Sequence, residues 1–286
     1  MIAYPSTFGG GSGEQPIHSN NNPTVTENLP VGTVWINDDT GEIFVCIDDT
    51  TDHNKWQGQI GTFIPSSTLG IVDIFGDNSG VVLYQFDSNA DDTGGQYNGT
   101  PHSITYENGK FDKCSDYNGN DSYVDTNFKT SNLNNTYSIS AWVKRLTTNT
   151  QDAVYTETKA TNNSYGTHIN FKGDGTSISA GHFKNVGGDF DNVGGDISGY
   201  ISSMTDWIHI VFTRDNGNEH KLYINGQLFN TVSCANVTNG SSYTGKLGAN
   251  PDYTAMNRYL KGSIDQVRIF NRPLTDSEAN QLYNEH

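Results

Sequence analysis

Apolar and polar positions alternate along most of the second half of the chain, and this period of two predicts β-strands. In the segment YSISAWVKRL, apolar Ile139, Ala141 and Val143 lie on one face, and Ser138, Ser140, Trp142 and Lys144 lie on the other. The segment from Trp207 to Arg214 is almost continuously apolar, as expected of a strand buried on both faces. Further strands are predicted at residues 81–86, 103–106, 111–117, 221–224, 227–229 and 260–270, in addition to the alternating segment at 137–146.

Turn residues separate these strands at short, regular intervals. Asn225-Gly226 favours the type I′ turn, whose twist matches that of the strands on either side. One helix is predicted at the C-terminal end, where Thr275 and Glu278 form a capping box ahead of a small apolar stripe. Many short strands with frequent turns predict an all-β, antiparallel jelly-roll sandwich over residues 81–286.

The first 80 residues show a different pattern. Residues 1–29 are rich in Gly, Asn and Pro without periodic apolar positions, which predicts an extended arm that is ordered only by a partner. Residues 30–64 contain two apolar strands around the turn Asp38–Gly41, with Trp56 after them. A lone hairpin is marginal in water, so this unit needs a third strand, a neighbouring domain or a second chain. Residues 65–80 are predicted to be a linker.

Composition narrows the classes of partner. The formal net charge is −16, and 16 Lys and Arg are scattered along the chain, so we expect no nucleic-acid partner. The sequence has no run of about 18 apolar residues and no signal-peptide pattern at its start, so we expect no membrane insertion. Three widely spaced cysteines, Cys46, Cys114 and Cys234, predict buried free thiols, although a Cys114–Cys234 bridge stays open.

Five segments from Val81 to Tyr283 together resemble the laminin G-like family within the concanavalin A-like lectin and glucanase superfamily. The resemblance implies the same sandwich, a fold that serves lectins, glycan hydrolases and adhesive or structural modules. The segments are VVLYQFDSNADDTGGQYNGT, GKFDKCSDYNGNDSYVDT, YSISAWVK, DWIHIVFTRDNGNEHKLYINGQL and GSIDQVRIFNRPLTDSEANQLY. Residues 30–61 contain a Gly-x-Val-Trp strand and an Ile-Phe-Val-Cys strand. With these two strands, the segment is similar to short N-terminal segments of phage tail and other virion proteins.

Catalysis is not expected. Glycan hydrolysis needs two carboxylates at a defined separation. Glucanases of this superfamily carry them in a Glu-x-Asp-x-x-Glu run, and no glutamate here has an aspartate two positions later. His168 and His209 lie on strand-like segments, where a lone histidine is more often packed than catalytic.

One metal site is suggested by the oxygen-rich loop that follows the first strand of the sandwich. Ca²⁺ takes six to eight oxygen ligands. First and last strands of jelly rolls are often neighbours, so an aspartate of the last strand can approach this loop. Together with the resemblance, this makes one structural Ca²⁺ a candidate, against the alternative of a solvated acidic turn. The candidate ligands are Asp87, Asn89, Asp92 and Asp265, with Asp91 in the same loop.

Ligand binding is predicted in the repeat NVGGDFDNVGGD at residues 185–196, because Gly-Gly argues against a regular strand interior and long loops often carry function. Its aspartates suit a cation or sugar hydroxyls, with Phe190 or Tyr200 as a stacking surface; a flexible duplicated loop is the alternative. A second Gly- and Asn-rich loop contains Tyr243, Asn250 and Tyr253. The candidate ligand-binding residues are Asp189, Asp191, Asp196, Tyr200, Tyr243 and Tyr253.

These features predict a phage virion surface protein of the tail-fibre or head-fibre type. Residues 1–64 would attach it to other virion proteins, and the sandwich would bind a host-surface glycan. The exposed hairpin suggests a homo-oligomer, with a trimer favoured. The alternatives are a structural decoration protein of capsid or tail without a specific ligand, and a non-catalytic carbohydrate-binding or adhesion module.

Overall fold

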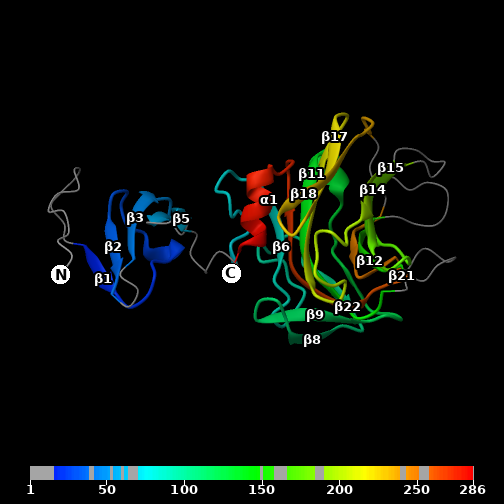
Figure 1. Ribbon diagram of the computed structural model, residues 1–286, viewed down its shortest axis with the longest axis horizontal. Coiled ribbons are helices and arrows are strands. Elements are labelled where there is room, and N and C mark those ends of the chain that lie inside the picture. The colour runs from blue at the N-terminus through cyan, green and yellow to red at the C-terminus, as the bar shows by residue number, and fades with distance from the viewer. Residues whose placement is uncertain are drawn as a thin grey trace. The chain divides into compact units, whose positions relative to one another are not determined.

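A computed structural model describes residues 16–38, 42–51, 54–58, 61–63, 70–148, 151–157, 166–183, 190–238, 243–250 and 258–285. Contacts between residues divide the chain into two compact units, with the boundary between Leu69 and Gly70 (Figure 1). No helix among the described residues has the length and apolar character needed to cross a membrane.

The N-terminal unit is a small sheet with a core of two tryptophans. Trp35 and Trp56 pack edge to face with centroids 6.0 Å apart, beside the buried Phe44 and Cys46. The sheet has the strand order β1 (Ile17–Ser19), β2 (Val34–Asn37), β3 (Ile43–Asp48), β4 (Lys55–Gly58) and β5 (Gly61–Phe63), with β1 parallel to β2 and the other pairs antiparallel.

Part of the predicted arm belongs to this unit, so the prediction that a partner orders it is wrong for residues 16–29. Strand β1 pairs with β2, and η1 (Val25–Glu27) follows it. The indole nitrogens of Trp35 and Trp56 donate to the carbonyls of Asn21 and Thr24, at 2.9 and 3.1 Å. The backbone of 21–24 therefore satisfies the two buried indole N–H groups. The third strand that the hairpin needs is β4, which carries Trp56.

The predicted antiparallel sandwich is confirmed, and it is built from two sheets. The sheet called the first sheet from here on has the order β15 (Phe190–Asp196), β14 (Ser177–Phe183), β13 (Gly166–Phe171), β12 (Ala153–Thr156), β19 (Lys246–Leu247), β10 (Tyr123–Asp125) and β7 (Thr100–His102). The second sheet has the order β18 (Gln227–Ser233), β17 (Glu219–Ile224), β16 (Trp207–Asp215), β11 (Tyr137–Arg145), β22 (Lys261–Phe270), β9 (Lys113–Asn118) and β8 (Thr105–Asn108). Strand β6 (Gly80–Tyr84) also pairs with β22. A short ribbon joins β20 (Ala249–Asn250) to β21 (Arg258–Tyr259), and η3 (Thr130–Leu133) precedes β11.

The core lies between the two sheets. Alternate residues of each strand enter it, among them Ile139, Ile169, Ile210 and Ile264, all at most 1% exposed. Asn225 and Gly226 have φ of 49° and 75°, which confirms the predicted type I′ turn between β17 and β18. The cysteines are buried and free, as predicted.

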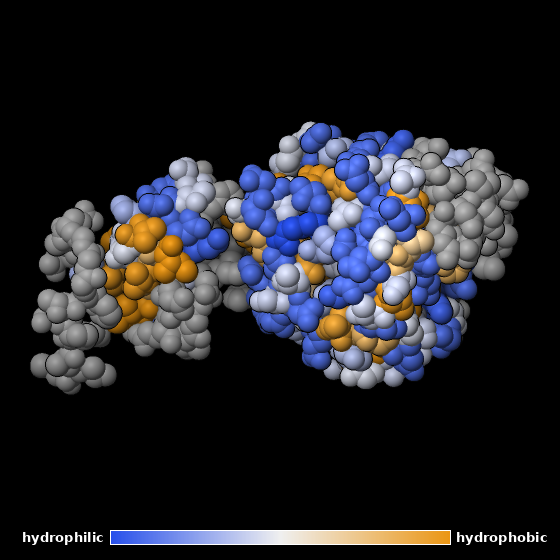
Figure 2. Space-filling view, turned by 90° about the horizontal axis from the view of Figure 1, so that it is seen from above, coloured by the Kyte–Doolittle hydropathy of each residue, from blue (hydrophilic) through white to orange (hydrophobic). Residues whose placement is uncertain are grey.

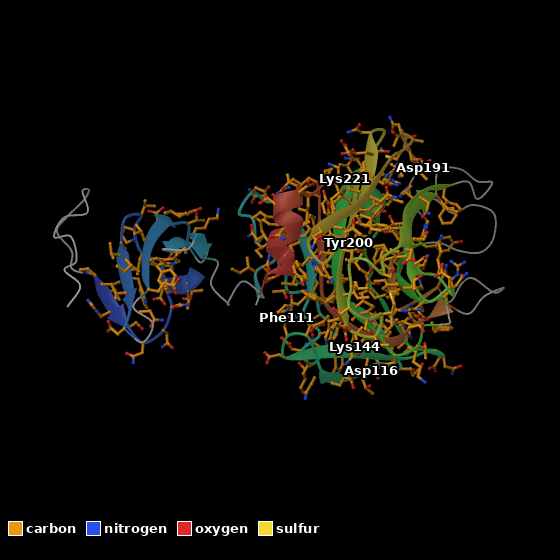
Figure 3. All side chains as sticks on the ribbon, in the orientation of Figure 1. Phe111, Asp116, Lys144, Asp191, Tyr200 and Lys221 are labelled. Atoms are coloured by element: carbon orange, nitrogen blue, oxygen red, sulfur yellow. The ribbon has the colours of Figure 1, made fainter. Side chains whose placement is uncertain are left out.

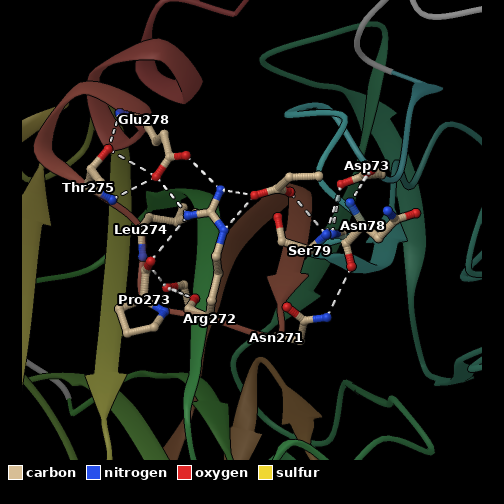
Figure 4. Close-up of polar contacts among 12 residues, drawn as sticks. Asp73, Asn78, Ser79, Asn271, Arg272, Pro273, Leu274, Thr275 and Glu278 are labelled. Atoms are coloured by element: carbon tan, nitrogen blue, oxygen red, sulfur yellow. Dashed lines mark hydrogen bonds and ion pairs between the residues drawn. The ribbon is translucent and has the colours of Figure 1, made fainter. Parts of the chain in front are cut away.

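Helix α1 (Asp276–Tyr283) covers the outer face of the second sheet, where Ala279 and Leu282 pack on Val211 and Tyr223. The predicted capping box is present. Arg272 links the helix to the segment before β6, because its guanidinium contacts both Glu278 and Asp77 at 2.6 Å (Figure 4).

Residues 70–80, predicted to be part of the linker, lie against the sandwich unit. Asp73 accepts hydrogen bonds from the backbone N–H groups of Asn78, Ser79 and Gly80. Ile74 also packs in the apolar cluster beneath α1. The compact unit therefore begins before Val81.

The prediction that residues 185–196 form a loop is wrong for residues 190–196, which form β15 at the edge of the first sheet. The glycines are what the strand requires. A Cβ on Gly194 would lie 2.2 Å from the carbonyl oxygen of Ile178, and Gly195 has a φ of +149°. Residues 185–189 lie outside the described residues.

Candidate functional site

The outer face of the first sheet, turned away from the core, carries a cluster of aromatic and polar side chains near its β15 edge. Ile169, Ala180 and Val193 are register partners on β13, β14 and β15 and enter the core. Because side chains alternate along a strand, the neighbouring row of His168, Gly181 and Asn192 faces outward. By the same alternation, Asn170, Ser179, Phe183 and Phe190 also lie on the outer face.

Three rings form the aromatic part of this cluster. Phe183 and Phe190 are register partners with ring centroids 5.3 Å apart. His168 lies 5.4 Å from Phe183 and 5.5 Å from Phe190, and its ring is perpendicular to that of Phe190. Phe190 is 45% exposed and is the one aromatic side chain among the exposed large apolar residues of the described ranges.

Polar groups surround the rings. The Ser179 hydroxyl donates to Asn192 Oδ1 at 2.5 Å, and the Asn192 side chain also hydrogen-bonds the His168 ring. Burial, with a smaller effect of the nearby Arg258 charge, lowers the pKa of His168 to about 4, so the imidazole is neutral at pH 7.

Two buried polar atoms of this cluster have no partner within the described part of the chain: His168 Nδ1 and Asn170 Oδ1. Their side chains are 6% and 5% exposed. A buried polar atom without a partner costs about 1–3 kcal/mol, so such atoms are rare and often mark functional positions. Both residues lie on β13, two positions apart and therefore on one face.

The β20–β21 ribbon lies beside this cluster. The Thr156 hydroxyl on β12 donates to the carbonyl of Ala249 at 2.8 Å. Arg258 on β21 is close enough for its charge to lower the pKa of His168. The ribbon therefore bounds the aromatic cluster on the side of β12.

The predicted ligand-binding residues are not gathered in one place. Asp191 and Asp196 lie near opposite ends of β15, where Asp191 accepts from Ala235 N at 2.6 Å and Asp196 from Ser198 N at 2.9 Å (Figure 3 labels Asp191). Tyr200 packs edge to face on Phe229 with centroids 5.2 Å apart. Tyr243 precedes β19, which β12, β13 and β14 separate from β15. Asp189 and Tyr253 lie outside the described residues.

Of the predicted metal ligands, Asp92 and Asn89 organise their own loop. Asp92 is 3% exposed, and its two carboxylate oxygens accept four backbone N–H bonds, from Leu83, Gly94, Gln96 and Tyr97, at 3.0–3.1 Å. Asn89 Oδ1 accepts from Asp91 N at 3.0 Å.

Asp265 and Asp87 instead contact one turn, residues 110–113. Asp265 Oδ2 accepts from the N–H groups of Lys110 and Phe111 at 2.9 Å, and Asp87 Oδ1 accepts from Lys113 N at 3.4 Å. Burial raises the pKa of Asp265 to about 7. Asp265 Oδ1 and the neighbouring Gln266 Oε1 are buried without partners. Across the described ranges, no group of three or more His, Cys, Asp or Glu side chains is placed to hold a metal ion.

Sequence reasoning missed His168, Asn170 and Phe183 as members of a site. A signal was present in the segment GTHINF, where polar His168 and Asn170 alternate with residues of the core face. Strand alternation places them on one face, but only the pairing of β13 with β14 and β15 brings Phe183 and Phe190 beside His168.

Comparisons with known proteins agree with this architecture. A family model described as "Concanavalin A-like lectin/glucanases superfamily" matches residues 118–280. No curated protein sequence matches the chain. Among solved structures, domain 4 of AbnA, an extracellular arabinanase from Geobacillus stearothermophilus solved in complex with arabinotriose, is 26% identical with a TM-score of 0.57. The match covers 71% of this chain and 97% of that domain.

Two toxin binding domains share the fold at lower identity. The binding domain of botulinum neurotoxin serotype D/C is 18% identical with a TM-score of 0.55, and that of Paraclostridial Mosquitocidal Protein 1 is 20% identical with a TM-score of 0.55. Each match covers 71% of this chain, and the chain spans about half of each binding domain (51% and 52%).

Proposed function

Because the chain belongs to the concanavalin A-like lectin/glucanases superfamily, we propose that its sandwich unit is a non-catalytic carbohydrate-binding module. The binding surface is the outer face of the first sheet around Phe190. The observation that carries this proposal is the exposed Phe190 ring beside His168, on a face where the buried polar atoms His168 Nδ1 and Asn170 Oδ1 have no partner. Sugars present an apolar face and several hydroxyl groups, and such sites commonly combine apolar contact with a few placed polar groups.

Arabinotriose in the solved structure of domain 4 of AbnA supports a carbohydrate ligand. The absence from the sequence of the Glu-x-Asp-x-x-Glu run of glucanases supports a role without catalysis. Glycan-array binding by the full chain tests the proposal, with Phe190→Ala as the test variant. Leu228→Ala on β18 of the other sheet is the matched control, because Leu228 is similarly exposed, at 40%. Loss of binding in Phe190→Ala alone supports the proposal, and equal binding by all three proteins contradicts it.

The finer proposal is a phage virion surface protein that binds a host-surface glycan and attaches through residues 1–64. The N-terminal unit supports it with a second apolar face. Val34, Ile36, Ile43 and Val45 are only partly buried, and Ile47 is 45% exposed. Figure 2 shows apolar residues gathered on the surface of this unit. An exposed apolar face of this kind is typical of an interaction surface.

Oligomerisation through this face, with a trimer favoured, is tested by light scattering of the full chain. Val45→Asp is the test variant, and Thr51→Asp, at an exposed position in a polar turn of the same unit, is the control. An oligomer that Val45→Asp alone dissociates supports the proposal. A monomeric wild-type chain contradicts it. A structural decoration protein would give the same oligomer without any glycan binding, so the glycan array separates the two functions.

Structural Ca²⁺ at the last strand is also a proposal. The residues that fit best are Asp265 and Asp87, because both contact the 110–113 turn and Asp265 Oδ1 is a buried oxygen without a partner. Gln266 Oε1 offers a further oxygen. Bound there, the cation would neutralise Asp265 and join β22 to the loop that follows β6.

A further inference from the structure

Whether the unpartnered atoms of the outer face donate or accept hydrogen bonds determines which class of ligand can bind there. We propose that the site selects neutral sugars, which donate hydroxyl hydrogen bonds, over acidic sugars, through two adjacent acceptors, His168 Nδ1 and Asn170 Oδ1. This inference rests on the proposed function and specifies its ligand.

The Asn192 side chain is the hydrogen-bond partner of the His168 ring, and its Oδ1 also accepts from the Ser179 hydroxyl. Because Nδ1 has no partner, this bond uses Nε2. In a neutral imidazole only one nitrogen carries hydrogen, and our proposal assigns it to Nε2, which donates to Asn192 and leaves Nδ1 as an acceptor.

Asn170 supplies the second acceptor. Its unpartnered atom is the carbonyl oxygen Oδ1, which cannot donate. Residues two apart on a strand project in the same direction with backbones about 7 Å apart. The two acceptors therefore suit two donors on one ligand, and the exposed Phe190 beside His168 suits its apolar face.

A carboxylate fits this pair poorly. It donates no hydrogen bond at neutral pH, and two acceptors would oppose its negative charge. Hydroxyl groups both donate and accept, so they satisfy both atoms. Arg258, whose charge acts on His168, is the group that an acidic sugar would use instead. The two ligand classes thus depend on different residues.

The test is an array that carries neutral oligosaccharides, including arabinotriose, and matched oligosaccharides ending in a uronate or sialate, probed with the full chain at pH 7.5. The expected result is retention on neutral glycans only. Asn170→Ala lowers that signal at least about tenfold, as expected for a lost hydrogen bond to a buried group. Asn170→Asp keeps an acceptor oxygen and retains neutral-glycan binding. Thermal midpoints of the variants check folding, and if Asn170→Asp does not fold, the selectivity of the wild-type chain decides.

Retention on acidic glycans that is lost in Arg258→Gln would overturn this inference and leave the carbohydrate-binding function standing. Failure of the wild-type chain to bind any glycan, or binding that Phe190→Ala does not change, would overturn the proposed function itself. The two failures are therefore distinguishable on one array.

Discussion

The imidazole of His168 meets the ring of Phe190 at a right angle, with ring centroids 5.5 Å apart. One of these side chains is almost fully buried and the other is 45% exposed. The pair therefore extends from the buried polar group Asn192, which hydrogen-bonds His168, to the exposed edge of the outer face at Phe190. Both rings come from strands, so backbone pairing fixes their positions.

Acid should destabilise the sandwich. Burial lowers the pKa of His168 to about 4, of His182 to about 2, and of His209 and His220 to about 3. In the unfolded chain these histidines bind protons below about pH 6.5, whereas in the folded chain they stay neutral at that pH. Their contribution to stability is therefore complete above pH 6.5 and is lost as the pH falls toward 4.

Two buried carboxyl groups oppose this effect. Burial raises the pKa of Asp265 to about 7 and also raises that of Glu157, so their effect on stability grows less favourable as the pH rises. Each histidine that stays neutral in the folded chain destabilises it by up to about 1.4 kcal/mol per pH unit below pH 6.5, so we expect the four histidines to outweigh these carboxyls and the free energy of unfolding to fall toward pH 4.5. Urea denaturation at pH 7.5, 6.5, 5.5 and 4.5 measures it. A free energy of unfolding that is flat or rises toward pH 4.5 would show that the histidines are not buried in this way.

Glu278 has two separable roles at the start of α1. Its carboxylate pairs with Arg272 at 2.6 Å, and it accepts from Thr275 N at 2.8 Å in the capping box. Glu278→Gln keeps the box but removes the charge, and should cost less than about 1 kcal/mol, because the pair is partly exposed. Glu278→Ala removes both and should cost about 1–2 kcal/mol. Equal losses in denaturant titrations of the two variants would contradict this division.

Gly194 is required by the close pairing of β15 with β14. A Cβ there would lie 2.2 Å from the carbonyl oxygen of Ile178, so Gly194→Ala should cost roughly 1–3 kcal/mol. Gly199→Ala is the matched control, because a Cβ there meets nothing within 4 Å. Thermal unfolding of both variants is the measurement. Equal midpoints for the two would mean that residues 190–196 do not form this strand.

Ca²⁺ should raise the thermal midpoint if it binds at Asp265. A cation there would relieve the burial of an unpaired carboxyl oxygen, and a ligand that binds only the folded chain stabilises it. We expect a chelator to lower the midpoint of the wild-type chain and to leave that of Asp265→Asn unchanged. A wild-type midpoint that chelator does not move would count against the site.

Much of the fold could be predicted because local signals and tertiary structure agree. Period-two alternation predicts β11, a nearly continuous apolar run predicts β16, Asn225-Gly226 predicts a hairpin, and Thr275 with Glu278 predicts a helix start. The loop prediction is wrong for residues 190–196, because Gly-Gly usually marks a loop and the edge-strand geometry that requires glycine depends on pairing with β14.

The candidate site was harder to predict for the same reason. Phe190 was considered as a stacking surface, but its polar partners His168 and Asn170 lie about 20 residues earlier in the chain. The register of the sheet places His168 and Phe190 side by side, and register cannot be read from the number of residues between them. The sequence points instead to the aspartates of the repeat, and in the structure Asp191 and Asp196 accept hydrogen bonds from backbone N–H groups.

The most direct measurement is the dissociation constant for the glycan that the wild-type chain binds best on the array, titrated calorimetrically into three proteins. The account predicts that Phe190→Ala weakens binding at least about tenfold, since stacking and packing contacts of one ring contribute about 1–3 kcal/mol. It predicts that Leu228→Ala binds as the wild-type chain does. An unchanged dissociation constant for Phe190→Ala, with its thermal midpoint intact, would show that the outer face of the first sheet is not the binding surface.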